Sequence, residues 1–245
     1  MTRACALLLA ALLLAGCGGD GGDDEPLTVF AAASLTEVFT ELSPETRFNF
    51  AGSDELATQI REGARADVYA AASPRYPEEL RDEGLVAEPR TFATNRLVLI
   101  VPRDNPAGLD SVWDVACGPP GGQPRVKLVI GAGGVPIGDY TRAALATRWR
   151  PVSRCVVSEE EDVKGVVGKV ALGEADAGFV YATDARAAGD DVRTIELPAG
   201  LQADVRYLVA VVRGSDQTNE ARAFVDLLLR DRGRRLLREA GFGVP

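Results

Sequence analysis

The chain has 245 residues, 46% of them hydrophobic, and a formal net charge of −9. This composition is typical of a globular protein, and with no long cluster of lysine and arginine we expect no nucleic-acid partner. The sequence contains no histidine, which excludes the usual general base of serine hydrolases and the most common transition-metal ligand.

The N-terminus has the features of an export signal. Arg3 precedes an apolar run at residues 6–15, which is shorter than the roughly 20 residues that span a bilayer. A basic start, a short apolar run and small residues at the exit are typical of a secretory signal. The exit, LAGC ending at Cys17, resembles the bacterial lipobox, in which the cysteine is acylated. We therefore predict a signal peptide at residues 1–16 and a lipid on Cys17; a plain signal peptide with an incidental cysteine is the alternative.

Residues 17–26 are rich in glycine and aspartate, which predicts a flexible tether. A calcium loop is the alternative, but the segment lacks the downstream bidentate glutamate and the flanking helices of such a loop. Beyond the tether, Cys117 and Cys155 are the remaining cysteines. Because exported proteins meet an oxidising compartment, we predict a disulfide between them, with two buried thiols as the alternative.

Short apolar runs alternate with helical stretches along the mature chain. In chain order, strands are predicted at residues 27–32, 47–51, 66–71, 96–101, 127–131, 155–157, 177–181, 192–197 and 205–212. Helices are predicted at residues 35–42, 54–62, 139–149 and 160–172, and two more close the chain. This alternation favours parallel sheets covered by helices, in two groups of βα units.

Three strand ends share one design, in which small residues lead from a strand into a helix. Ser34 follows the first strand and has Glu37 three residues later, a capping-box pattern. Ser53 follows the second strand, and a glycine-rich run occupies residues 131–139. Helix N-termini carry unpaired N–H groups and a partial positive charge, so several of them together can bind an anion at the carboxyl ends of the strands. Ordinary capped helix starts are the alternative, and the residues alone indicate only a small anion.

A series of segments spans almost the whole mature chain in order: TVFAAASLT (28–36), FAGS (50–53), GARADVY (63–69), NRLVL (95–99), VPIG (135–138), EDVK (161–164), VYATDA (180–185), YLVAVV (207–212) and GFG (241–243). Together these segments resemble the molybdate-binding proteins of ABC transporters. The resemblance implies an α/β, two-lobed type II periplasmic-binding-protein fold, in which each lobe is a mainly parallel sheet flanked by helices. It implies a first lobe of residues 27–93 and 209–245, a second lobe of residues 94–208, and a ligand cleft between them.

The resemblance also implies a function and a ligand set. It implies an extracytoplasmic, monomeric binding protein without catalysis or cofactor, which delivers molybdate or tungstate to the permease subunits of an ABC importer and contacts the membrane through Cys17. The implied ligands of the oxyanion are the hydroxyl and backbone N–H groups of Ser34 and Ser53, the backbone N–H groups of Ile137 and Val163, and the hydroxyl of Tyr181. A dianion without a proton only accepts hydrogen bonds, so a site made of donors suits it. Molybdenum or tungsten enters only as the oxyanion.

The residues around these positions add one supporting pattern and two departures. Ser158 and Glu161 form a second capping-box pattern before Val163. Asp54 stands where the family commonly has a small or hydroxyl residue; we expect it to face solvent, and in the cleft it would instead favour a protonated anion such as phosphate. Ser73 stands where family members often carry an acid, and we expect it to affect the local loop rather than ligand choice.

Three other functions stay open as alternatives. A sulfate- or phosphate-binding protein would use the same fold. An iron-binding relative would need clustered tyrosines or a histidine, and only Tyr181 occupies a suitable position. A remote alternative is an exported serine hydrolase acting through Ser34 or Ser53, but neither serine lies in a Gly-x-Ser-x-Gly elbow.

Overall fold

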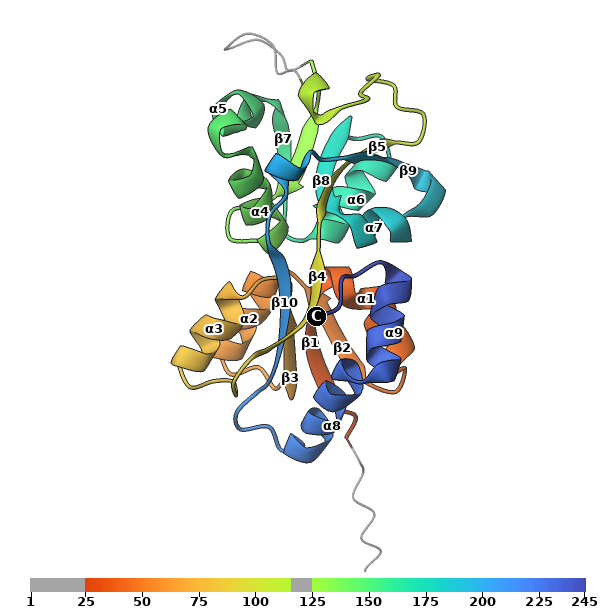
Figure 1. Ribbon diagram of the computed structural model, residues 1–245. Helices are drawn as coiled ribbons and strands as arrows, with labels where there is room; N and C mark the ends of the chain where they lie inside the picture. The colour runs from red at the N-terminus through yellow and green to blue at the C-terminus, as the bar shows by residue number, and fades with distance from the viewer. Residues whose placement is uncertain (1–24, 116–124) are drawn as a thin grey trace, which may run out of the picture.

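The computed structural model describes residues 25–115 and 125–245, which form two lobes stacked end to end (Figure 1). Cys17, the predicted lipid attachment site, and Cys117, one half of the predicted disulfide, lie outside the described residues. Cys155 is buried and disulfide-bonded, and its pairing with Cys117 stays a prediction. Within the described ranges, no helix has both the length and the apolar character needed to cross a membrane.

Each lobe is built on one five-stranded sheet. The first sheet has the order β2-β1-β3-β10-β4, from β1 (Thr28–Ala32), β2 (Arg47–Ala51), β3 (Val68–Ala71), β4 (Arg90–Asn95) and β10 (Val205–Val211). The second has the order β7-β6-β8-β5-β9, from β5 (Leu97–Pro102), β6 (Leu128–Gly131), β7 (Val156–Glu160), β8 (Ala177–Tyr181) and β9 (Val192–Glu196). In each sheet three neighbouring strands are parallel, and the fourth strand, β10 or β5, runs antiparallel to both of its neighbours. The predicted two-lobed α/β fold is therefore confirmed.

Helices cover both faces of each sheet (Figure 1). The first lobe carries α1 (Thr36–Leu42), α2 (Ser53–Arg61), α3 (Arg75–Asp82), α8 (Thr218–Leu229) and α9 (Asp231–Ala240). The second lobe carries α4 (Pro136–Leu145), α5 (Trp149–Val152), α6 (Val163–Ala171) and α7 (Ala182–Ala187). These helices place buried apolar side chains against the inner strands, of which β3, β5, β6 and β8 are buried at every position, as expected of strands covered on both faces.

The two lobes are joined where β4 and β10 lead from one sheet toward the other (Figure 1). β4 ends at Asn95 and β5 begins at Leu97, so a single residue separates the two sheets. Just before β10, the Gln202 side chain accepts a hydrogen bond from the Leu97 N–H and donates one to the Leu97 carbonyl, both at 3.0 Å. Both predicted lobe boundaries, at residues 93/94 and 208/209, fall inside these two strands.

Several predicted elements differ from those observed. β4 was not predicted because its sequence RTFATN mixes polar and apolar residues, and its place is set by pairing with β10. Helices α3 and α7 were also missed. α4 begins at Pro136 rather than at 139. α6 begins at Val163 rather than at 160, because β7 continues to Glu160. Both observed starts place a helix N-terminus at the cavity between the lobes.

Candidate functional site

A small cavity of about 20 Å³ lies between the lobes, at the carboxyl ends of strands from both sheets. It is lined by Ala32, Ala33, Ser34, Ala51, Gly52, Ser53, Ala72, Val135, Pro136, Ile137, Asp162, Val163 and Tyr181. All five residues implied by the family resemblance are among them, brought from five separate segments. Since a single water needs about 10–15 Å³ of such space, the cavity suits one small ligand rather than an organic substrate.

The first lobe contributes two buried serines. Ser34 lies in a short 3-10 turn (Ala33–Leu35) between β1 and α1, and its Oγ is 2.9 Å from the hydroxyl of Tyr207. Ser53 is the first residue of α2, and its Oγ accepts a hydrogen bond from the Ala72 N–H at 3.0 Å. Because this donor occupies Oγ as an acceptor, the Ser53 hydroxyl proton is free to be donated into the cavity.

The second lobe contributes two helix N-termini. Ile137 is the second residue of α4 and follows Pro136, which has no N–H group, so the Ile137 N–H is the first donor of that helix. Val163 is the first residue of α6, whose N-cap Asp162 accepts a hydrogen bond from the Gly165 N–H at 2.9 Å. Asp162 therefore serves a donor farther along the turn, and the helix itself supplies no acceptor for the Val163 N–H.

Tyr181 ends β8 and is buried, and its hydroxyl has no hydrogen-bond partner among the described residues. The ring packs edge-on against Tyr207 and Tyr140, with ring centroids 5.9 and 6.5 Å away. Burial raises the pKa of Tyr181 well above its ordinary value, so the hydroxyl keeps its proton at neutral pH. A buried unpaired donor beside a cavity is costly unless a ligand satisfies it.

The charges around the cavity are arranged without a cation in contact with it. No lysine or arginine is among the described residues that line the cavity. Asp54 does not line it either, but the expectation that Asp54 faces solvent is wrong, because its Oδ1 atom is buried at the boundary between the lobes. Burial raises the pKa of the Asp54 carboxyl, and hydrogen bonds from the first backbone N–H groups of α2 lower it. Asp54 thus lies at the start of α2 without lining the cavity.

The two predicted capping boxes, at Ser34 and at Ser158, are wrong. The 3-10 turn and α1 have no side-chain cap, because the Ser34 hydroxyl contacts Tyr207 instead. The Ser158 hydroxyl donates to Glu160 at 2.5 Å within β7, while Asp162 caps α6. Ser73 follows β3 without lining the cavity. The capping pattern thus predicted helix starts at nearly the right positions but gave the wrong hydrogen-bond partners, because the serine hydroxyl groups bond to other side chains instead.

The lobes touch each other around the cavity. Tyr76 on α3 donates to the carbonyl of Gly134 at 2.5 Å, and Lys164 on α6 forms an ion pair with Glu37 on α1 at 2.7 Å. Gly52 lies so close to the other lobe that a Cβ atom there would be 2.5 Å from the carbonyl oxygen of Glu161. These contacts show that the structure is a closed arrangement, in which glycine is required at position 52 for the lobes to meet.

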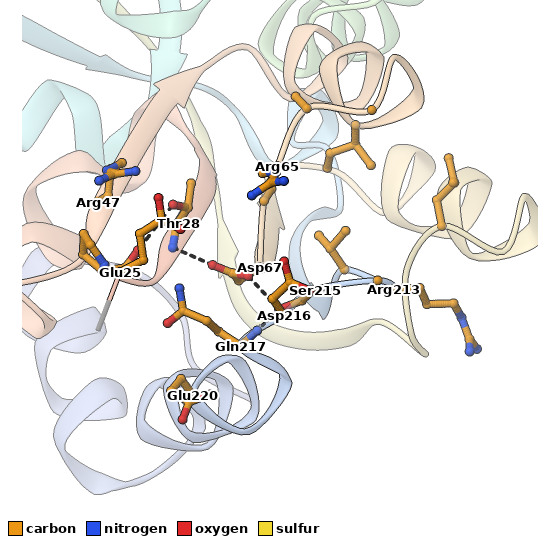
Figure 2. A pocket seen from close by; sticks show the side chains of 18 residues that line it. Glu25, Thr28, Arg47, Arg65, Asp67, Arg213, Ser215, Asp216, Gln217 and Glu220 are labelled. Carbon is orange, nitrogen blue, oxygen red and sulfur yellow. Dashed lines mark hydrogen bonds between the residues drawn. The ribbon is translucent and has the colours of Figure 1, made fainter. Parts of the chain in front are cut away.

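A larger hollow of about 980 Å³ lies at the opposite end of the first sheet (Figure 2). Its buried carboxylate is already paired: Asp67 accepts hydrogen bonds from the Thr28 N–H at 2.8 Å and from the Ser215 hydroxyl at 2.6 Å. None of the predicted site residues lines it. We therefore assign the site to the small cavity between the lobes, where buried donors lack partners, rather than to this larger one.

The fold and the enclosed cleft between lobes define a solute-binding protein of the two-lobed periplasmic type. The sequence profile of the family described as bacterial extracellular solute-binding proteins matches residues 27–243. The molybdate-binding protein of Mycobacterium tuberculosis is 34% identical over 263 residues, covering 97% of each chain. This chain therefore belongs to the molybdate-binding proteins of ABC transporters, within the bacterial extracellular solute-binding family, which acts outside the cytoplasm and consists of binding proteins rather than enzymes.

Solved structures agree on the fold. The periplasmic molybdate-binding protein of Azotobacter vinelandii superimposes with a TM-score of 0.75 at 19% identity, covering 89% of this chain and 99% of that one. The sulfate-binding protein of Mycobacterium tuberculosis superimposes nearly as well, with a TM-score of 0.72 at 16% identity over 89% and 86% of the two chains. Because structures of proteins named for different oxyanions fit almost equally, the fold alone does not select the ligand.

Proposed function

We propose that this protein captures one molybdate or tungstate dianion between its lobes and delivers it to the permease subunits of an ABC importer. The observation that carries the proposal is the convergence of Ser34, Ser53, Ile137, Val163 and Tyr181 on one small cavity. The hydroxyl groups of these residues, together with backbone N–H groups, offer donors to a ligand that can only accept. Charge-assisted hydrogen bonds of this kind are stronger than neutral ones, and the helix N-termini supply partial positive charge.

The proposal includes a way to hold the protein at the membrane. A lipid on Cys17 followed by a flexible tether would keep a monomeric binding protein near its permease. The lipobox-like sequence at residues 14–17 supports this anchor. Mass spectrometry of the membrane-extracted protein tests it: a diacylated N-terminal Cys17 is expected, whereas a mature N-terminus without lipid would contradict the anchor.

Sulfate is the second candidate ligand, because it is also a tetrahedral dianion without a proton at neutral pH. A donor-only site accepts it by the same chemistry, and only the size of the anion separates it from molybdate. Phosphate is less suited, since it retains a proton at neutral pH and needs an acceptor. Asp162 is the one acidic residue among the described residues that line the cavity, and its Oδ1 atom already accepts a hydrogen bond from the Gly165 N–H, whereas Asp54 does not line the cavity.

Titration calorimetry of the purified mature protein with molybdate, tungstate, sulfate and phosphate tests this function. We expect one site per chain, with micromolar or tighter affinity for molybdate and tungstate, and at least tenfold weaker binding of sulfate and phosphate. Binding of sulfate or phosphate at micromolar concentration without binding of molybdate or tungstate would overturn the ligand assignment. The Ser43→Ala variant is a suitable control, because its hydroxyl pairs with Thr46 away from the cavity.

A further inference from the structure

A chain of hydrogen bonds reaches the ligand cavity from the junction of the two lobes. Tyr207, buried on β10, does not line the cavity, but its hydroxyl is 2.9 Å from the Ser34 Oγ atom. The Nδ2 atom of Asn95, the last residue of β4, lies 3.4 Å from the same hydroxyl. Asn95 and Tyr207 lie on the two strands that lead from one lobe toward the other, so the Ser34 hydroxyl is tied to this junction.

The direction of the chain of hydrogen bonds is fixed at Asn95. The Oδ1 atom of Asn95 accepts a hydrogen bond from the Arg96 N–H at 2.9 Å, which assigns the other atom of the amide as the NH₂ group. That group donates to the Thr183 Oγ1 atom at 2.9 Å and to the Tyr207 hydroxyl. The Tyr207 oxygen is therefore an acceptor toward Asn95, and its own proton is left for Ser34.

The direction of the Tyr207–Ser34 hydrogen bond decides whether Ser34 presents its proton or its lone pairs to a ligand. If Tyr207 donates, Ser34 Oγ is the acceptor and its own proton points away from Tyr207, toward the cavity. If Ser34 donated instead, it would turn lone pairs toward a dianion, and the Tyr207 proton would lose its acceptor. Burial raises the pKa of Tyr207 well above its ordinary value, so the tyrosine keeps the proton that it donates.

We propose that Tyr207, with its direction set by Asn95, is a positioning residue that holds the Ser34 hydroxyl as a hydrogen-bond donor toward the bound oxyanion. This role presupposes the anion capture proposed above. The two serines then follow one rule with different partners. The Ser53 Oγ atom accepts a hydrogen bond from the backbone N–H of Ala72. The Ser34 Oγ atom accepts one from the side chain of Tyr207, on a strand that leads from one lobe to the other.

Tyr69 provides a matched control for Tyr207. Both tyrosines are fully buried, on the adjacent strands β3 and β10. The Tyr69 hydroxyl donates at 2.6 Å to the backbone carbonyl of Ser53 rather than to a serine hydroxyl. Replacing either tyrosine by phenylalanine removes a buried hydrogen bond to a site serine, and Tyr207→Phe also removes the acceptor of the Asn95 amide. Only Tyr207→Phe releases a hydroxyl group that faces the ligand.

A double-mutant cycle tests the proposal, because residues that act through one another have non-additive effects. Calorimetry is performed on Tyr207→Phe, Ser34→Ala and the double variant with molybdate, or with sulfate if the wild type prefers it. We expect Tyr207→Phe to weaken binding about tenfold, and the double variant to bind no more weakly than Ser34→Ala alone. Tyr69→Phe should weaken binding less than threefold and combine additively with Ser34→Ala.

Independent, multiplicative losses in the Tyr207→Phe and Ser34→Ala pair would overturn the proposal, as would equal effects of Tyr207→Phe and Tyr69→Phe. Asn95→Leu provides a second route if Tyr207→Phe does not fold, since it keeps the tyrosine and removes the donor that directs it. The loss of affinity caused by Asn95→Leu should likewise disappear in the Ser34→Ala background. If that loss persists, Asn95 does not act through Tyr207 and Ser34, which contradicts the proposal. If the wild-type protein prefers sulfate, the molybdate assignment is refuted, but the double-mutant cycle measured with sulfate still tests the role of Tyr207.

Discussion

The two lobes offer the cavity different kinds of donors. In the proposed site, the first lobe supplies the hydroxyl groups of Ser34 and Ser53 with the backbone N–H groups of the same residues, whereas the second lobe supplies the backbone N–H groups of Ile137 and Val163 and one phenolic hydroxyl. A hydroxyl donor depends on residue identity, but a backbone donor depends only on where a helix begins. The first lobe is therefore expected to lose function through conservative side-chain changes, and the second lobe through changes in the backbone.

The largest expected effect is the loss of both first-lobe hydroxyl groups. Each hydrogen bond to a charged group contributes about 1.5–3 kcal/mol, and about 1.4 kcal/mol corresponds to a factor of ten. The Ser34→Ala, Ser53→Ala double variant should therefore bind molybdate at least about 100-fold more weakly in calorimetry. Ser43→Ala should bind like the wild type. Near-normal affinity of the double variant would remove the first lobe from the site.

The phenolic hydroxyl of the second lobe should show a split between affinity and stability. Tyr181→Phe removes one donor to the anion, so we expect binding to weaken about tenfold. Because this hydroxyl has no hydrogen-bond partner among the described residues, thermal unfolding of the ligand-free protein should occur at the same or a higher temperature. A lower unfolding temperature together with unchanged affinity would indicate a structural rather than a binding role.

A backbone donor of the second lobe can be removed without changing the helix. Proline is tolerated at the first position of a helix and lacks an N–H group, and Asp162 before Val163 already has the extended conformation that a following proline requires. Val163→Pro should weaken anion binding by roughly tenfold. Val163→Ala keeps the N–H and should have a smaller effect. Equal affinities of the two variants would show that the backbone N–H is not used.

The last prediction concerns the pH dependence of stability in the second lobe rather than anion affinity. Asp184 is buried on α7, and burial raises its pKa to about 7; Lys164 at 3.6 Å lowers the pKa, and Glu37 and Asp162 raise it. The folded state thus holds a proton that the unfolded state loses above its ordinary pKa of 3.8. Stability should consequently fall as pH rises from about 4 to about 7 and then level off.

Asp184→Asn tests that slope, because asparagine mimics the protonated carboxyl at every pH. Relative to the wild type, the unfolding temperature of the variant should be similar near pH 4 and higher near pH 8 by more than about 5 °C, because a pKa raised from 3.8 to about 7 corresponds to about 4 kcal/mol. Scanning calorimetry of the ligand-free protein at both pH values measures the difference. A wild-type unfolding temperature that rises between pH 4 and pH 7 would contradict the raised pKa.

Local patterns in the sequence were enough to predict the strands that form the centre of both sheets. The predicted strands at residues 66–71 and 177–181 contain β3 and match β8, the middle strands of the two sheets, because short apolar runs bounded by turn residues specify buried strands locally. The family resemblance placed the five ligand positions, and the cavity brings those five residues together. By residue pattern alone the strand ends indicated only a small anion, since a helix N-terminus attracts any negative charge.

Contacts between distant residues were decided by the tertiary structure alone. β4 forms because β10 pairs with it across more than a hundred residues, and no pattern within RTFATN signals that partner. The Ser34 hydroxyl contacts Tyr207 rather than capping its own helix, and one oxygen of Asp54 is buried between the lobes rather than facing solvent. The sequence by itself determined which donors are present, because residue type and helix starts are local properties. The tertiary structure determined where those donors point, because direction depends on neighbours from other strands and from the other lobe.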